Sequence, residues 1–92
     1  HVFAIYGLGT GGEEFLHIRN RIKAELAYGI DKQEKKVEML PTYTPTEELP
    51  LADAVLITLK KYNEEIEQFL KHRFEKVFYW EDMAKRGVYK RL

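Results

Sequence analysis

The segment Val2-Phe-Ala-Ile-Tyr-Gly-Leu-Gly-Thr-Gly-Gly12 joins a short apolar run to a glycine-rich run with the spacing G-x-G-x-x-G. The apolar run predicts a buried parallel strand that ends at the first glycine. A glycine run of this spacing between a strand and a helix is typical of a phosphate-binding loop. Gly7 would permit the tight turn, Gly9 would let a phosphate approach the backbone, and Gly12 would let the helix pack closely on the sheet. The alternative is a strand-to-helix turn that needs glycine for its backbone alone.

The residues after the first two glycines predict a helix that begins at Thr10. Thr10 and Glu13 have the spacing of a capping box, in which each side chain bonds the other residue's backbone N–H. Apolar residues then recur at core-facing helical spacing, at Phe15, Ile18 and Ile22. Glu13 and Glu14 fall in the predicted first turn, where carboxylates favour the helix dipole but repel a phosphate. Because the loop contains no Lys or Arg, we expect weak or absent affinity for a dinucleotide.

An acidic residue and two lysines complete the predicted site. Asp31 ends the second predicted strand about 20 residues after the glycines, where an acid would bind a ribose hydroxyl and favour NAD over NADP. Aspartate is also a common turn residue, so both interpretations of Asp31 stay open. Lys60 and Lys61 follow the fourth predicted strand and could meet a phosphate or a sugar acid, or simply be solvated. The predicted binding residues are Gly7, Gly9, Thr10, Gly11, Gly12, Asp31, Lys60 and Lys61.

Five apolar segments separated by helical or polar segments predict an α/β fold. The predicted strands cover residues 2–6, 24–30, 37–43, 52–59 and 74–80. Helices are expected from Thr10, from Thr44 (with Glu47 as a second capping box) and from Asn63. This alternation favours a Rossmann-like three-layer sandwich with a five-stranded parallel sheet in the order 3-2-1-4-5. In that order the glycine loop lies at the switch point, opposite Lys60 and Lys61, where such folds bind ligands.

Length and composition limit the classes of protein. Ninety-two residues, 45% hydrophobic and 33% charged, are typical of one small globular domain, expected over residues 1–82 with a polar tail or linker over residues 83–92. Fifteen basic and fifteen acidic side chains balance, which disfavours nucleic acid and membrane surfaces as partners. There is no cysteine or serine, and the three histidines show no metal-ligand spacing. We expect a cytoplasmic location, and the start at His1-Val2 suggests an excised domain.

Several motifs recur in the order of a known group of domains. The sequence resembles the small Rossmann-like domains appended to bacterial enzymes of sugar and surface-polysaccharide metabolism. These include the nucleotide-sugar-binding N-terminal domains of sugar acetyltransferases and the terminal domains of some sugar methyltransferases and glycosyltransferases. The motifs that carry the resemblance are Ile5–Gly12, Ile30–Asp31, Thr44–Leu49, Ala52–Ile57 and Tyr79–Trp80.

The resemblance implies a module that binds or positions a nucleotide, a nucleotide-sugar or a dinucleotide, while a neighbouring domain performs the chemistry. Carried over by position, Gly7, Gly9 and Gly12 would bound the phosphate loop, and Asp31 would meet a ribose or a base. We therefore expect a non-catalytic binding domain of a larger protein, with no catalytic or metal site of its own. The alternatives are the cofactor half of an NAD-dependent oxidoreductase and an interaction module that has lost its ligand.

Overall fold

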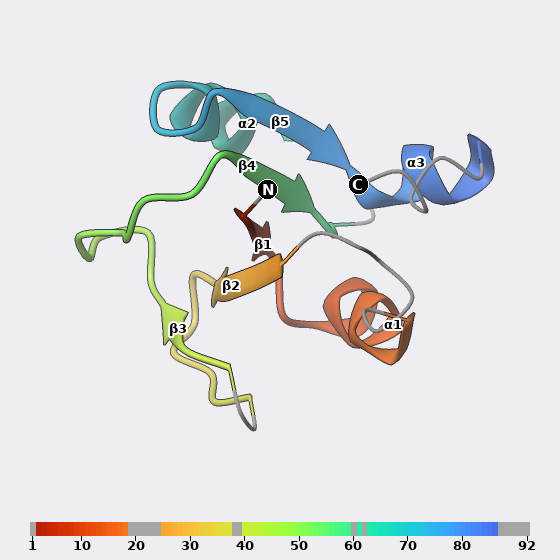
Figure 1. Ribbon diagram of the computed structural model, residues 1–92, viewed down its shortest axis with the longest axis horizontal. Helices are drawn as coiled ribbons and strands as arrows, with labels where there is room; N and C mark the ends of the chain where they lie inside the picture. The colour runs from red at the N-terminus through yellow and green to blue at the C-terminus, as the bar shows by residue number, and fades with distance from the viewer. Residues whose placement is uncertain (1, 19–24, 38–39, 60, 62, 87–92) are drawn as a thin grey trace.

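Five parallel strands form the sheet, and its order is β3-β2-β1-β4-β5 (Figure 1). The computed structural model describes residues 2–18, 25–37, 40–59, 61 and 63–86. The elements in chain order are β1 (Val2–Tyr6), α1 (Thr10–Ile18), β2 (Glu25–Ile30), β3 (Thr42–Tyr43), β4 (Ala54–Ile57), α2 (Glu64–Lys71), β5 (Lys76–Tyr79) and α3 (Trp80–Arg86). The predicted α/β class and the predicted strand order are thus confirmed.

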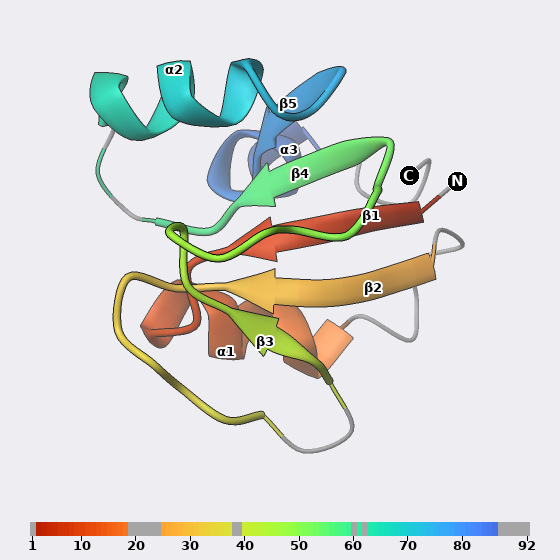
Figure 2. The same cartoon turned by 90° about the vertical axis from the view of Figure 1, so that its left-hand side faces the viewer.

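Side chains that alternate along the strands build a separate core on each face of the sheet. The core shared with α1 and α3 contains Phe3, Ile5, Leu8, Phe15, Ala54, Leu56, Trp80 and Met83. The core shared with α2 contains Ala4, Tyr6, Tyr28, Ile30, Val55, Ile57, Ile66, Leu70 and Phe74. The connection from β3 to β4 crosses the sheet on the face opposite α1 (Figure 2). The sheet therefore has a layer on either side. None of the helices in the described ranges is long and apolar enough to cross a membrane.

The third strand and the segment after it differ from the sequence prediction. β3 contains only Thr42 and Tyr43 at the edge of the sheet. The prediction of a helix from Thr44 is wrong, because the chain forms a turn there. In that turn the Glu47 N–H donates to the Thr44 carbonyl at 3.0 Å, and the Thr44 N–H donates to the Glu47 carboxylate at 3.2 Å. Only two residues separate this turn from Pro50, which is too few for a further helical turn.

The two helices after β4 are positioned by a cap and by an aromatic contact. Asn63 caps α2 as predicted, since its side-chain oxygen accepts the Ile66 N–H at 3.1 Å. In α3, Trp80 packs edge-on against Phe15, with ring centroids 5.3 Å apart. Met83, from the segment expected to be a tail, is buried in the same core. The described fold therefore continues past residue 82 to the end of α3.

Candidate functional site

The glycine loop lies at the carboxyl edge of the sheet, and two of its glycines have structural reasons to be glycine. Gly7 has a φ of +107°, a conformation that L side chains rarely adopt, and its N–H donates to the Ile30 carbonyl at 2.8 Å. A Cβ on Gly12 would lie 2.3 Å from the Gly7 carbonyl oxygen. The backbone interpretation of the glycine run therefore holds for Gly7 and Gly12.

Gly9 has no comparable structural reason. Apart from its neighbours in the chain, the one described atom within 4 Å of a Cβ built on Gly9 is the Lys35 Nζ, at 3.8 Å. Its φ also lies outside the positive range that favours glycine. The side of Gly9 that a methyl group would occupy is open, which is what close approach of a ligand to the backbone requires.

Helix α1 begins at Thr10, as predicted. The Gly9 carbonyl accepts the Glu13 N–H at 2.9 Å, so Gly9 stands at the N-cap and Thr10 and Gly11 are the first helical residues. The Thr10 side chain lies outside the described part of the structure, so its predicted capping-box bond to Glu13 stays a prediction. Glu13 lies in the first turn as predicted, whereas Glu14 falls in the next turn. One carboxylate, instead of two, therefore opposes an anion at this helix terminus.

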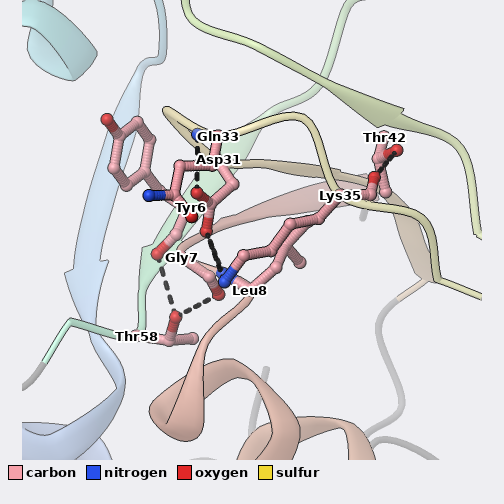
Figure 3. Close-up of polar contacts among 8 residues, drawn as sticks. All are labelled: Tyr6, Gly7, Leu8, Asp31, Gln33, Lys35, Thr42 and Thr58. Atoms are coloured by element: carbon pink, nitrogen blue, oxygen red, sulfur yellow. Dashed lines mark hydrogen bonds and ion pairs between the residues drawn. The ribbon is translucent and has the colours of Figure 1, made fainter.

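Asp31 ties the glycine loop to the end of β2 (Figure 3). One of its carboxylate oxygens accepts the Leu8 N–H at 2.8 Å and the other accepts the Gln33 N–H at 2.9 Å. The second bond makes Asp31 a turn residue, as one of its two interpretations predicted. The first bond engages a loop N–H that would otherwise be available to a ligand. Binding of a ribose by Asp31 stays a prediction.

Lys35 is a site residue that the sequence interpretation missed. Its Nζ lies 3.9 Å from the Asp31 carboxylate (Figure 3) and 3.8 Å from the position of a Cβ built on Gly9. The ammonium group is about one-third exposed, so this ion pair contributes little to stability. The glycine loop has no Lys or Arg of its own, and the connection after β2 places the Lys35 ammonium group beside it. The spacing of Asp31 and Lys35, four residues apart, was the available signal.

Thr58 is a second residue that the sequence did not single out. Its hydroxyl is within hydrogen-bond distance of the Gly7 carbonyl, at 2.6 Å, and of the Tyr6 carbonyl, at 2.9 Å. Thr58 therefore joins the ends of β1 and β4 at the switch point. Of the two predicted lysines beyond it, Lys61 is exposed and Lys60 lies outside the described residues. Their predicted approach to the glycine loop stays a prediction.

Among the cavities lined by described residues, two bear on the choice of ligand at this edge of the sheet. On the α1 and α3 side, a cavity of about 290 Å³ is lined by Glu14, Thr58, Trp80, Glu81, Ala84 and Lys85. Its two carboxylates disfavour a polyphosphate there. On the α2 side, a cavity of about 380 Å³ is lined by Tyr6, Lys32, Thr44, Pro45, Thr46, Glu65, Ile66 and Phe69. Burial, and secondly the Asp31 carboxylate, raise the pKa of Tyr6, so its phenol is neutral at physiological pH.

Neither a metal-binding cluster among the described residues nor a similar protein assigns a function to this chain. Within the described ranges, no three His, Cys, Asp or Glu side chains are grouped so that they could hold a metal ion. Comparisons with protein-family models, with curated proteins and with solved structures found no match. Function is therefore inferred from the residues at the carboxyl edge of the sheet.

Proposed function

We propose that this chain is a non-catalytic Rossmann-like domain that binds a nucleotide or a nucleotide-sugar within a larger protein. The observation that carries the proposal is the meeting of Lys35 and Asp31 beside Gly9, at the carboxyl edge of a sheet of order 3-2-1-4-5. Ligands of open α/β sheets bind outside this edge, next to the point where the strand order reverses. The motif resemblance adds bacterial sugar or polysaccharide metabolism as the setting of the parent protein.

Each of the three residues has a role in this proposal. Lys35 would pair with one phosphate group, which the open side of Gly9 allows to approach the start of α1. Asp31 would accept a ribose hydroxyl, because an ionised carboxylate has about four acceptor positions and two backbone N–H groups occupy two of them. Glu13 in the first turn favours a ligand of low negative charge over a long polyphosphate.

The same edge bears on the two alternative functions. An NAD-binding half of an oxidoreductase would place a diphosphate near Glu13, as a nucleotide-sugar with a diphosphate would, and either would compete with Asp31 for the Leu8 N–H, so the charge at this edge favours a nucleotide with a single phosphate group over both. An interaction module without a ligand is favoured by the fact that these two hydrogen bonds of Asp31 hold the loop by themselves. Ligand binding measured directly decides between these functions.

The test is thermal unfolding and calorimetric titration with UMP, UDP-glucose, NAD, NADP and S-adenosylmethionine. A bound ligand at a hundred times its Kd raises the free energy of unfolding by about 2.7 kcal/mol. Lys35→Gln should weaken that binding about tenfold or more, since hydrogen bonds to charged groups contribute about 1.5–3 kcal/mol. Gly9→Ala should weaken it by obstructing the approach of the phosphate. Lys36→Gln, at an exposed neighbouring lysine, is the matched control.

Three results would count against the proposal. Stabilisation by none of the five compounds would leave the interaction module as the better function. Stabilisation by NAD alone would favour the oxidoreductase half. Equal losses in Lys35→Gln and Lys36→Gln would show that general positive charge, and not the position of Lys35, determines affinity.

A further inference from the structure

We infer that the cavity of about 380 Å³ on the α2 side of the sheet binds a neutral, polyhydroxylated ring, the chemistry of a monosaccharide. Its walls come from four separate parts of the chain: the end of β1, the residue after Asp31, the turn after β3 and helix α2. Small-molecule sites have volumes of about 300–1,000 Å³, so this cavity is large enough for one ring and its substituents but too small for a dinucleotide.

The Tyr6 hydroxyl is the group that most clearly points to a ligand. Tyr6 is 3% exposed and lines the cavity, and its hydroxyl has no hydrogen-bond partner in the part of the chain that the structure describes. Because the phenol stays neutral, it can both donate and accept a hydrogen bond. The hydroxyl atom is not among the fully buried polar atoms of the described residues, so it is open to the cavity, where a ligand hydroxyl can bond it.

The remaining lining groups match a ring that carries hydroxyls and no charge. Glu65 supplies acceptors, Lys32 supplies donors and Thr46 supplies a hydroxyl. One carboxylate and one ammonium balance, so the cavity favours a neutral ligand over an ion. Ile66 and Phe69 form an apolar wall on α2, against which the C–H groups of a sugar ring can pack.

An anion is the disfavoured ligand for this cavity. The first turn of α2 contains Glu64, Glu65 and Glu67, so the helix dipole is already matched by carboxylates. Lys35, the cation that the described residues place beside the glycine loop, lies on the other side of Asp31 from the Tyr6 ring (Figure 3). The phosphate and the ring would therefore occupy opposite sides of the same two strand ends. The inference rests on the proposed function, because both place their ligand at the carboxyl edge of the sheet. Free sugars, which carry no phosphate, test the inference separately.

The experiment is an NMR titration of the 92-residue chain, with amide shifts followed at residues 44–46 and 65–69. Glucose, N-acetylglucosamine and ribose are added at millimolar concentrations, and uridine, adenosine and inorganic phosphate are added in parallel. The sugars should shift these amides in a saturable way, and phosphate should not. Tyr6→Phe should weaken sugar binding roughly threefold to tenfold through loss of one hydrogen bond. Glu65→Gln should weaken it by about tenfold or more.

A matched control and three outcomes complete the test. Glu64→Gln removes the same charge from the neighbouring exposed residue, which does not belong to the cavity lining, and should leave sugar binding unchanged. The inference is overturned if no sugar shifts these amides, if nucleosides shift them and sugars do not, or if Glu64→Gln matches Glu65→Gln. Lys35→Gln should leave free-sugar binding intact. Sugar binding without nucleotide binding would refute the proposed function alone, and the converse would refute this inference alone.

Discussion

Replacing Gly12 with alanine tests the geometry of the glycine loop most directly. Glycine to alanine inside a helix normally stabilises by up to about 1 kcal/mol. At Gly12 the added methyl group would lie 2.3 Å from the Gly7 carbonyl oxygen, a backbone atom that no rotamer change can move. Overpacking costs about 1–3 kcal/mol, and a backbone clash belongs at the upper end. The net expectation for Gly12→Ala is a loss of about 2 kcal/mol, or about 8–16 °C in Tm for a domain of this size.

Gly9→Ala is the matched control, because the same methyl group would meet a single lysine nitrogen at an ordinary contact distance of 3.8 Å. At an N-cap, alanine is less favourable than glycine by at most about 1 kcal/mol. Differential scanning calorimetry and urea unfolding of the two variants measure the difference. The structural reasoning is refuted if Gly12→Ala unfolds at or above the wild-type temperature, or if Gly9→Ala is the more destabilised variant.

Substitutions at three further positions probe Tyr6, Asp31 and the N-cap of α2, Asn63. Burial raises the pKa of Tyr6 and Tyr28 above 10.0, so the folded state holds their protons more tightly than the unfolded state does. Their contribution to stability is therefore complete below about pH 10 and is lost as the pH rises further, and Tyr6→Phe should reduce that loss in urea unfolding. Asp31→Ala should cost about 1–3 kcal/mol, because it leaves the partly buried Leu8 N–H without its acceptor; unchanged stability would contradict this. Asn63→Ala should cost about 1 kcal/mol, and Asn63→Ser should restore most of it.

The architecture was predictable because its signals are local and repeated. The apolar run from Val2 to Tyr6 and the run around Ala54–Ile57 each specify a buried parallel strand. Glycine at the end of β1 and Asn63 before α2 mark where the chain changes from one element to the next. Short right-handed connections between such elements leave few strand orders, and the predicted order is the one observed.

The error at Thr44 has a physical origin in the capping motif itself. A capping-box glutamate bonds the backbone N–H three residues earlier, and Glu47 makes this bond with Thr44 in the structure. The same bond fits a single turn, because it involves no residue beyond the fourth. Whether a helix follows depends on the residues after the motif, and here Pro50 arrives too soon. The motif is therefore evidence for a turn of the chain, and the helix needs separate evidence.

The candidate site was only partly predictable because its charges come from outside the glycine run. The sequence interpretation searched the loop for a cation and found Glu13 instead. Lys35 reaches the loop through the path of the connection after β2, and Asp31 orients it by a contact of 3.9 Å. Tyr6 faces the α2 side of the sheet because of its position in the alternation along β1. No sequence motif marks that position as part of a site.

The distribution of charge along the carboxyl edge limits the ligand more closely than the glycine spacing does. Carboxylates stand in the first turns of both α1 and α2, so neither helix terminus offers an uncompensated positive dipole. Among the described residues, Lys35 is the cation beside the glycine loop, and it forms an ion pair with Asp31. A ligand with several adjacent negative charges would meet repulsion on either side of Lys35. A ligand with one phosphate group and an uncharged, hydroxyl-rich remainder would place each part beside groups of matching chemistry, because Tyr6 and its neighbouring hydroxyls lie across the same strand ends.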